Sequence, residues 1–118
     1  MTSETAVAFP FVLLLILLIV QFGVWQHATH VAQVTAMEAL ASTRVYGGSP
    51  TAGRVKASSM LARLGHSVLH STHVSVSRTS DAARVEVAGV AQAVVPFLRL
   101  PVNSVAYGPV ERFRGDGR

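Results

Sequence analysis

The stretch that decides the fold is "ETAVAFPFVLLLILLIVQFGVW", residues 4–25, which begins with one acid and then contains almost no polar residue. From Ala6 to Trp25 only Gln21 is strongly polar. As an α-helix this segment is about 30 Å long, which matches the thickness of the hydrocarbon core of a bilayer. The stretch therefore predicts a membrane-spanning helix.

A cleaved signal peptide is the main alternative to a retained helix. Such a peptide has a basic start, an apolar stretch of about 7–15 residues and a cleavage site between small residues. Here no Lys or Arg precedes the apolar stretch, the stretch is longer, and Gln26, His27 and His30 follow it. We therefore expect the helix to be retained. Trp25 is expected at the membrane interface, where aromatic side chains gather.

The distribution of basic residues bears on topology and on binding partners. All ten Lys and Arg residues lie at or after Arg44, and taken literally this count weakly favours a cytoplasmic C-terminus. The charges stand singly, without a basic cluster or interleaved aromatic residues. Despite the formal net charge of +4, we therefore expect no nucleic-acid partner.

The helix is expected to continue beyond the membrane to about residue 45, because residues 26–45 are rich in alanine and contain neither glycine nor proline. Pro10, which lacks an N–H, is a candidate kink in the membrane half. The segment "GGSP", residues 47–50, predicts the end of the helix. Residues at a spacing of three or four give the outer half a face for packing against another helix, formed by Ala28, Val31, Thr35 and Glu38.

The rest of the chain predicts a small head. Residues 51–66 predict a short second helix, with Gly53 near its start and Gly65 as its C-terminal cap. The alternating valines of "THVSVSR", residues 72–78, and "ARVEVAGV", residues 83–90, predict an antiparallel hairpin around the turn "TSDA". Gly89 suggests a bulge or bend. Residues 102–107 predict a third, edge strand.

The expected fold class is therefore α+β: a long N-terminal transmembrane helix, a short second helix and a small antiparallel sheet of two or three strands. We expect the valine face of the sheet to pack on the second helix or on the outer half of the long one, because an isolated hairpin is marginally stable. The expected divisions are a transmembrane and extended helix (1–46), a head (47–113) and a flexible tail (114–118).

Nothing in the sequence predicts catalysis, a cofactor or a metal site. The chain has six acidic residues, no cysteine, no glycine-rich phosphate loop and no arrangement of Ser, His and Asp typical of a hydrolase. Of the five histidines, His70 and His73 have opposite parity in a strand, so we expect them on opposite faces rather than around one ion. The chain is not expected to be an enzyme.

Glu4 allows two interpretations. In the first, it is an ordinary acid in the first turn of a helix, favoured by the helix dipole and placed at the headgroup boundary. In the second, it enters the apolar layer when subunits pack side by side, where a carboxylate requires a positive partner. The free amino terminus of a neighbouring subunit would be such a partner and would set the stagger between subunits. The residues alone leave both open.

A set of motifs over nearly the whole chain carries a resemblance to a known family. Glu4 stands six residues before Pro10 in an apolar start, and "FVLLLILLIVQFG" follows at residues 11–23. Further motifs are Trp25, His27 with Ala28, "VAQ" at 31–33, Glu38, "YGG" at 46–48 and "GPVERF" at 108–113. Together they resemble the TadE-like family, the pilin-like proteins of tight-adherence (Flp, type IVb) pilus systems, of the actinobacterial type.

The resemblance implies a minor pilin or pseudopilin-like membrane protein that acts in pilus assembly or related secretion. Its implied partners are the membrane, other pilin-like subunits, the pilus and secretion machinery and, where a leader is cut, prepilin peptidase. It also implies a single pass through the cell membrane with a cytoplasmic N-terminus and an extracytoplasmic head, against the count of basic residues. In this reading Glu4 sets the register between subunits.

Two expectations stay open at this stage. Family members carry a short basic leader that ends in Gly shortly before the Glu, whereas Met1 stands three residues before Glu4. Either translation starts upstream of Met1 or the protein is not processed in this way. The alternative function is a single-pass anchor or receptor subunit, whose head binds a partner protein or an anionic wall polymer through its arginines without polymerising.

Overall fold

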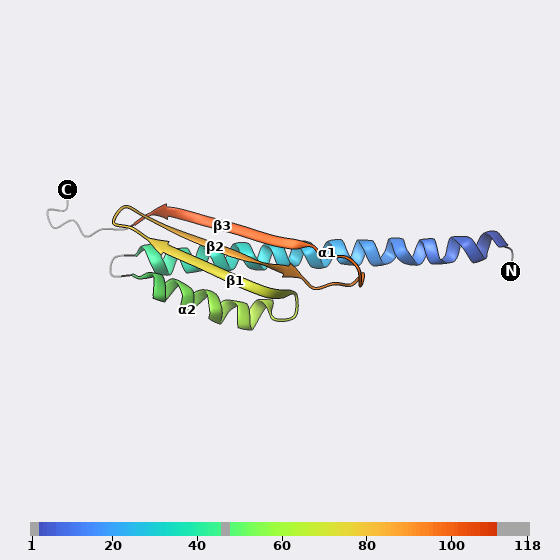
Figure 1. Cartoon of the computed structure of the whole chain (residues 1–118), viewed down its shortest axis with the longest axis horizontal. Coiled ribbons are helices and arrows are strands. Elements are labelled where there is room, and N and C mark those ends of the chain that lie inside the picture. Colours follow the sequence, from blue (N-terminus) through green and yellow to red (C-terminus); the bar gives the residue numbers. More distant parts are fainter. Residues whose placement is uncertain (1–2, 46–47, 111–118) are drawn as a thin grey trace.

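The computed structural model describes residues 3–45 and 48–110 and has an α+β fold (Figure 1). The elements in order are α1 (Ser3–Arg44), α2 (Pro50–Met60), the π-helical turn η1 (Leu61–Gly65), β1 (Leu69–Arg78), β2 (Ala82–Ala91) and β3 (Pro101–Pro109). The predicted fold class is confirmed. The proposed tail at 114–118 lies outside the described residues, as do parts of the "YGG" and "GPVERF" motifs.

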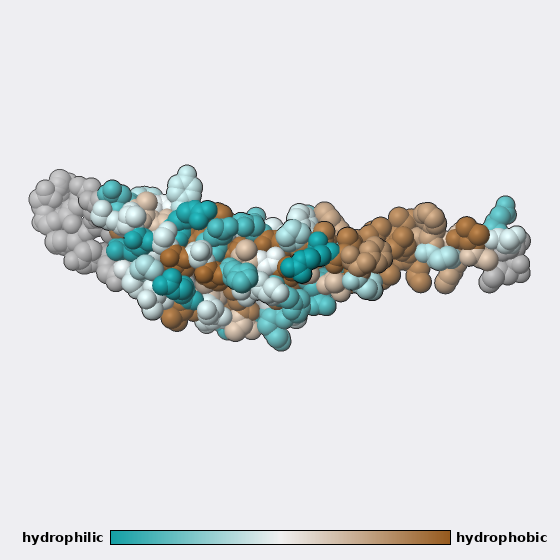
Figure 2. Space-filling model, viewed as in Figure 1, coloured by the Kyte–Doolittle hydropathy of each residue, from teal (hydrophilic) through white to brown (hydrophobic). Residues whose placement is uncertain are grey.

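Helix α1 is continuous over 42 residues, or about 63 Å. Pro10 lies inside it, and the helix continues on both sides of the proline. The C-terminal half of α1 runs under the sheet, whereas the N-terminal half projects from the head (Figure 1). Figure 2 shows that this projecting half is covered by apolar side chains, in contrast to the mixed surface of the head.

The second predicted helix is present as α2 followed by η1. The Ser49 side chain caps α2 by accepting a hydrogen bond from the Ala52 N–H at 3.1 Å, and Pro50 occupies the first turn. Gly53 lies at the contact between α2 and α1, where an added Cβ would collide with Thr43 Oγ1. The glycine near the start of the helix is therefore a site of close helix packing.

The sheet is antiparallel with the strand order β1-β2-β3, so the predicted hairpin and the predicted third, edge strand are both confirmed. In the hairpin Val74 pairs with Val87 and Val76 with Val85. The turn between the strands is held by Thr79, whose hydroxyl accepts hydrogen bonds from the two backbone N–H groups of residues 81 and 82, at 3.2 and 3.1 Å.

The predicted irregularity at Gly89 is a β-bulge on the neighbouring strand. The register of β1 against β2 shifts between His70 and His73, and Ser71 has a positive φ of 53°. Gly89 lies opposite this bulge, where an added Cβ would be 3.1 Å from the carbonyl oxygen of His70. The glycine leaves room for the displaced backbone of β1.

The prediction that His70 and His73 lie on opposite faces is wrong, and the bulge is the reason. His70 pairs with Val90 and His73 with Ala88, two positions that share a face of β2 because they are two residues apart. Because the bulge inserts one extra residue into β1 between the two histidines, their side chains no longer alternate between the two faces. By this register both belong to the same face of the sheet.

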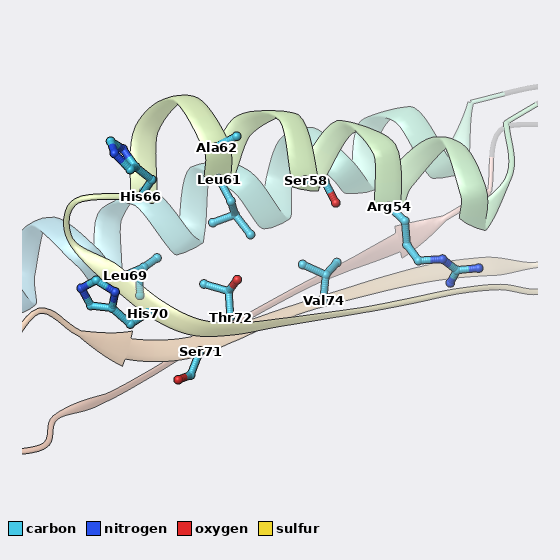
Figure 3. Close-up of a pocket in the computed structure, with 11 residues that line it drawn as sticks. Arg54, Ser58, Leu61, Ala62, His66, Leu69, His70, Ser71, Thr72 and Val74 are labelled. Atoms are coloured by element: carbon cyan, nitrogen blue, oxygen red, sulfur yellow. The ribbon is translucent and has the colours of Figure 1, made fainter.

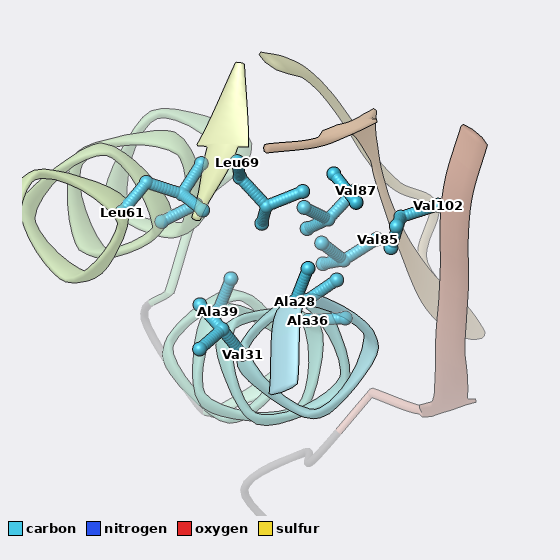
Figure 4. Packing of buried hydrophobic residues seen from close by; sticks show 12 residues of the cluster. Ala28, Val31, Ala36, Ala39, Leu61, Leu69, Val85, Val87 and Val102 are labelled. Carbon is cyan, nitrogen blue, oxygen red and sulfur yellow. The ribbon is translucent and has the colours of Figure 1, made fainter. Parts of the chain in front are cut away.

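The core lies between the inner face of the sheet and the C-terminal half of α1 (Figure 4). Val85 and Val87 of β2 are fully buried, and Leu61 and Leu69 close the core on the side of α2. The helix opposes them with small side chains, which let the sheet approach its backbone closely, namely Ala28, Ala32, Ala36 and Ala39. The valine face of the sheet therefore packs on the C-terminal half of α1, which is one of the two arrangements expected from the sequence.

Candidate functional site

The projecting half of α1 carries most of the exposed large apolar side chains of the described chain. Its large apolar side chains are exposed, for example Phe11 at 67% and Ile19 at 71%. Among the described helices α1 alone is long and apolar enough to cross a membrane, with a mean hydropathy of 2.8 over its most apolar window. Only 6% of that window is buried in the chain. Such a helix fits a membrane anchor.

Glu4 lies at the N-terminal end of this apolar surface. It forms a continuous strip with side chains at helical spacing, which include Ala8, Phe11 and Leu15. The first basic residue of the sequence is Arg44, about 60 Å away along the helix. Within the described residues no basic side chain reaches Glu4. A positive partner for this carboxylate would have to come from another molecule or from the undescribed end of the chain.

The predicted helix-packing residues have a partner inside the chain. Ala28 and Thr35 are fully buried and Val31 is 4% exposed, all beneath the chain's own sheet. Only Glu38 is exposed. The spacing of small residues signals close packing correctly but does not tell whether the packed element belongs to the same chain. The surface that stays free for another helix is the projecting half of α1.

Gln21, which in the sequence only interrupts the apolar stretch, has a structural role. Its side chain is 2% exposed and is bound to the connection between β2 and β3, residues 92–100. Its Oε1 accepts hydrogen bonds from the N–H groups of Val94 and Val95 at 2.6 and 3.1 Å. Its Nε2 donates to the Gln92 carbonyl oxygen at 3.0 Å. The amide therefore attaches the head to the apolar half of α1.

Trp25 lies one helical turn further along α1. Its ring is half-buried, and its Nε1–H donates to the carbonyl oxygen of Pro101, at the start of β3, over 3.3 Å. The ring centroid is 6.0 Å from that of Phe22. Trp25 thus joins helix and sheet at the end of the head nearest the apolar half of α1. Its placement at a membrane interface stays a prediction.

A groove of about 590 Å³ lies between α2 and β1 on the head (Figure 3). Its floor includes Leu61 and Leu69, and its polar lining includes Arg54, His66 and His70. His70 also contacts the side-chain oxygen of Gln92 through its Nε2. The groove combines an apolar floor with one permanent positive charge, so it suits an anionic group attached to an apolar body.

The geometry offers little else that resembles a chemical site. Among residues 3–45 and 48–110, no group of three or more His, Asp or Glu side chains is placed to hold a metal ion. The ion pair found in this part of the chain joins Arg84 to Glu86 at 3.5 Å on the exposed surface of β2. An exposed pair of this kind contributes little to stability and does not form a reaction centre.

Comparison with protein families supports the assignment made from the motifs. The family model described as TadE-like protein matches residues 1–40, which comprise the apolar half of α1 and most of the half under the sheet. The resemblance to the TadE-like family is therefore confirmed over this segment. Searches of curated proteins and of solved structures gave no match.

Proposed function

We propose that this chain is a minor pilin or pseudopilin-like subunit that takes part in assembly of a tight-adherence (type IVb) pilus or of a related secretion apparatus. The observation that carries the proposal is the match of residues 1–40 to the TadE-like family, since this segment contains the exposed apolar helix. The role is structural and involves no catalysis. Its partners are the membrane, other pilin-like subunits and the assembly machinery.

The mechanism rests on two uses of the same helix. In the membrane the apolar half of α1 is solvated by lipid and holds the subunit in place. During assembly this half packs against the apolar helices of other subunits along the strip from Glu4 to Leu15. Between helices the Glu4 carboxylate loses contact with water, so it requires a positive group, and a neighbour's amino terminus at the right stagger supplies one.

The proposed topology places the N-terminus in the cytoplasm and the head outside the membrane, so that the sheet and α2 lie on the surface of the assembly. Processing by prepilin peptidase is a further part of this proposal and applies if the natural chain carries a leader before Met1.

Substitution of Glu4 tests the mechanism. In Glu4→Gln the side chain keeps its size but loses its charge, so membrane insertion should persist while co-purification with other pilus components is lost. Glu38→Gln is the matched control, because Glu38 is an exposed acid on the same helix and outside the apolar half. If Glu4→Gln assembles as well as the unsubstituted protein, the register mechanism is refuted.

The groove on the head favours a second function, a single-pass anchor or receptor subunit that binds an anionic partner without polymerising. Arg54 is its permanent charge. On this alternative Arg54→Gln removes function while Glu4→Gln leaves it intact. The pilin-like function predicts the opposite pair of results.

A further inference from the structure

The connection between β2 and β3, residues 92–100, lies at the end of the head nearest the apolar half of α1 (Figure 1). Phe97 is 81% exposed, more than any other large apolar side chain described. The Leu98 N–H donates to the Val95 carbonyl oxygen at 3.0 Å, so Phe97 lies in a tight turn. A phenyl ring held in this way faces solvent unless something outside the chain covers it.

The height of this turn along α1 is fixed by hydrogen bonds. Gln21 binds the N–H groups of Val94 and Val95, two and three residues before Phe97. If Ala6–Trp25 crosses the hydrocarbon core, Gln21 lies about 6 Å inside its outer boundary. On this placement the turn is held among the acyl chains of the outer leaflet, within about 6 Å of the headgroup boundary.

The composition of the turn agrees with this depth. The exposed side chains at its tip are an aromatic ring followed by the cation of Arg99, and the neighbouring Leu98 is half-buried. Aromatic residues gather at the membrane interface, and Arg binds the phosphates of anionic lipids. Trp25, which donates to the carbonyl oxygen of Pro101 at the start of β3, lies one helical turn closer to the headgroups than Gln21.

We infer that residues 95–99 form a second membrane contact, in which Phe97 enters the outer leaflet and Arg99 binds anionic lipid headgroups. This inference rests on the membrane anchoring by α1 that is part of the proposed function. With two contacts, the helix and the turn, the head has a fixed tilt and height relative to the bilayer. With the helix as its only contact, the head could rock as the helix changes its tilt.

Single-cysteine labelling of the full chain tests the inference, and the absence of native cysteine leaves one label per variant. Phe97→Cys, Tyr107→Cys and Ile16→Cys are labelled with an environment-sensitive fluorophore in vesicles of phosphatidylcholine and phosphatidylglycerol. Tyr107 is the matched control, because its ring is 76% exposed at the opposite end of β3. Ile16 reports on anchoring by α1.

The expected result is a blue-shifted emission at position 97 that nitroxide lipids quench, with aqueous emission at position 107. Phosphatidylglycerol should strengthen the contact of position 97 with lipid. Replacing Arg99 by Gln in the Phe97→Cys background should reduce this gain about fivefold, the contribution of one cation at an anionic surface. The same emission at positions 97 and 107 would overturn the inference. A label at position 97 that is shielded from both lipid and water would also overturn it, because this result indicates a protein contact. Failure of the label at 16 to meet lipid would instead refute anchoring itself.

Discussion

Replacing Gln21 by Met removes the three hydrogen bonds that attach residues 92–95 to α1 while nearly preserving the length of the side chain. The Val95 N–H then has no acceptor, and because the Val95 residue is 1% exposed, water does not replace it. A buried polar group left without a partner costs about 1–3 kcal/mol. For the two N–H groups together we expect local stability to fall by about 3 kcal/mol.

Amide hydrogen exchange measures this quantity directly in the protein reconstituted in nanodiscs. A loss of about 3 kcal/mol raises the exchange rates of the Val94 and Val95 amides by about 150-fold, if exchange follows local opening. Gln33→Met is the matched control, because Gln33 is an exposed glutamine of the same helix, and it should leave both rates unchanged. Equal exchange at Val95 in Gln21→Met and in the unsubstituted protein would refute the attachment.

Three further substitutions, two of them paired with a control variant, test the packing of the head. Gly53→Ala should lower the free energy of unfolding by about 1–3 kcal/mol, because the added Cβ collides with Thr43. Gly23→Ala is the control and should not lower it, because nothing lies within 4 Å of a Cβ at this position. Equal melting temperatures of the two variants would contradict this prediction. Thr35→Val should raise stability by about 1 kcal/mol, because the buried hydroxyl has no partner among the described residues. In Thr43→Val a 2.8 Å bond to a backbone carbonyl is lost, so no such gain is expected, and a gain in both variants would refute the distinction. Val85→Ala should lower stability by about 2 kcal/mol, measured by chemical denaturation in micelles, by opening a cavity in a fully buried position.

Periodicity in the sequence was sufficient to predict the elements of the fold. The apolar run and the alanine-rich segment predict one long helix, and the alternation around Val74, Val76, Val85 and Val87 predicts the hairpin, because each pattern depends only on neighbours along the chain. The glycine in β2 suggests a bulge or bend, and the structure has a bulge opposite it, in the neighbouring strand β1. These features are local, and the structure confirms them.

What the sequence could not predict depends on contacts between distant segments. The parity of His70 and His73 is reversed by one extra residue in β1, which no local pattern reveals. The small residues around Ala28 signal close packing, but their partner is a sheet that begins about 40 residues later in the chain. In the sequence Gln21 interrupts the apolar stretch, whereas in the structure both polar atoms of its side chain bind residues 92–95.

The role of Glu4 remains a proposal because it concerns a second molecule. The described chain leaves the carboxylate at the end of an exposed apolar strip, about 60 Å from the first basic residue. A carboxylate in this position is compatible with water at the headgroups before assembly and requires a cation after it. Under the proposed function, the two interpretations of Glu4 describe successive states of one subunit.

The most direct test of lateral packing by α1 is photocrosslinking from its projecting half in cell membranes, with the crosslinked peptides identified by mass spectrometry. A photoreactive residue replaces Ala8, Phe11 or Leu15 on the strip that begins at Glu4, or Leu13 on the opposite face, where the native side chain is 50% exposed. We predict crosslinks from the three strip positions to the apolar helix of a pilin-like subunit, with a weaker signal from position 13. Crosslinks to lipid alone, equal from all four positions, would contradict a helix that packs beside others.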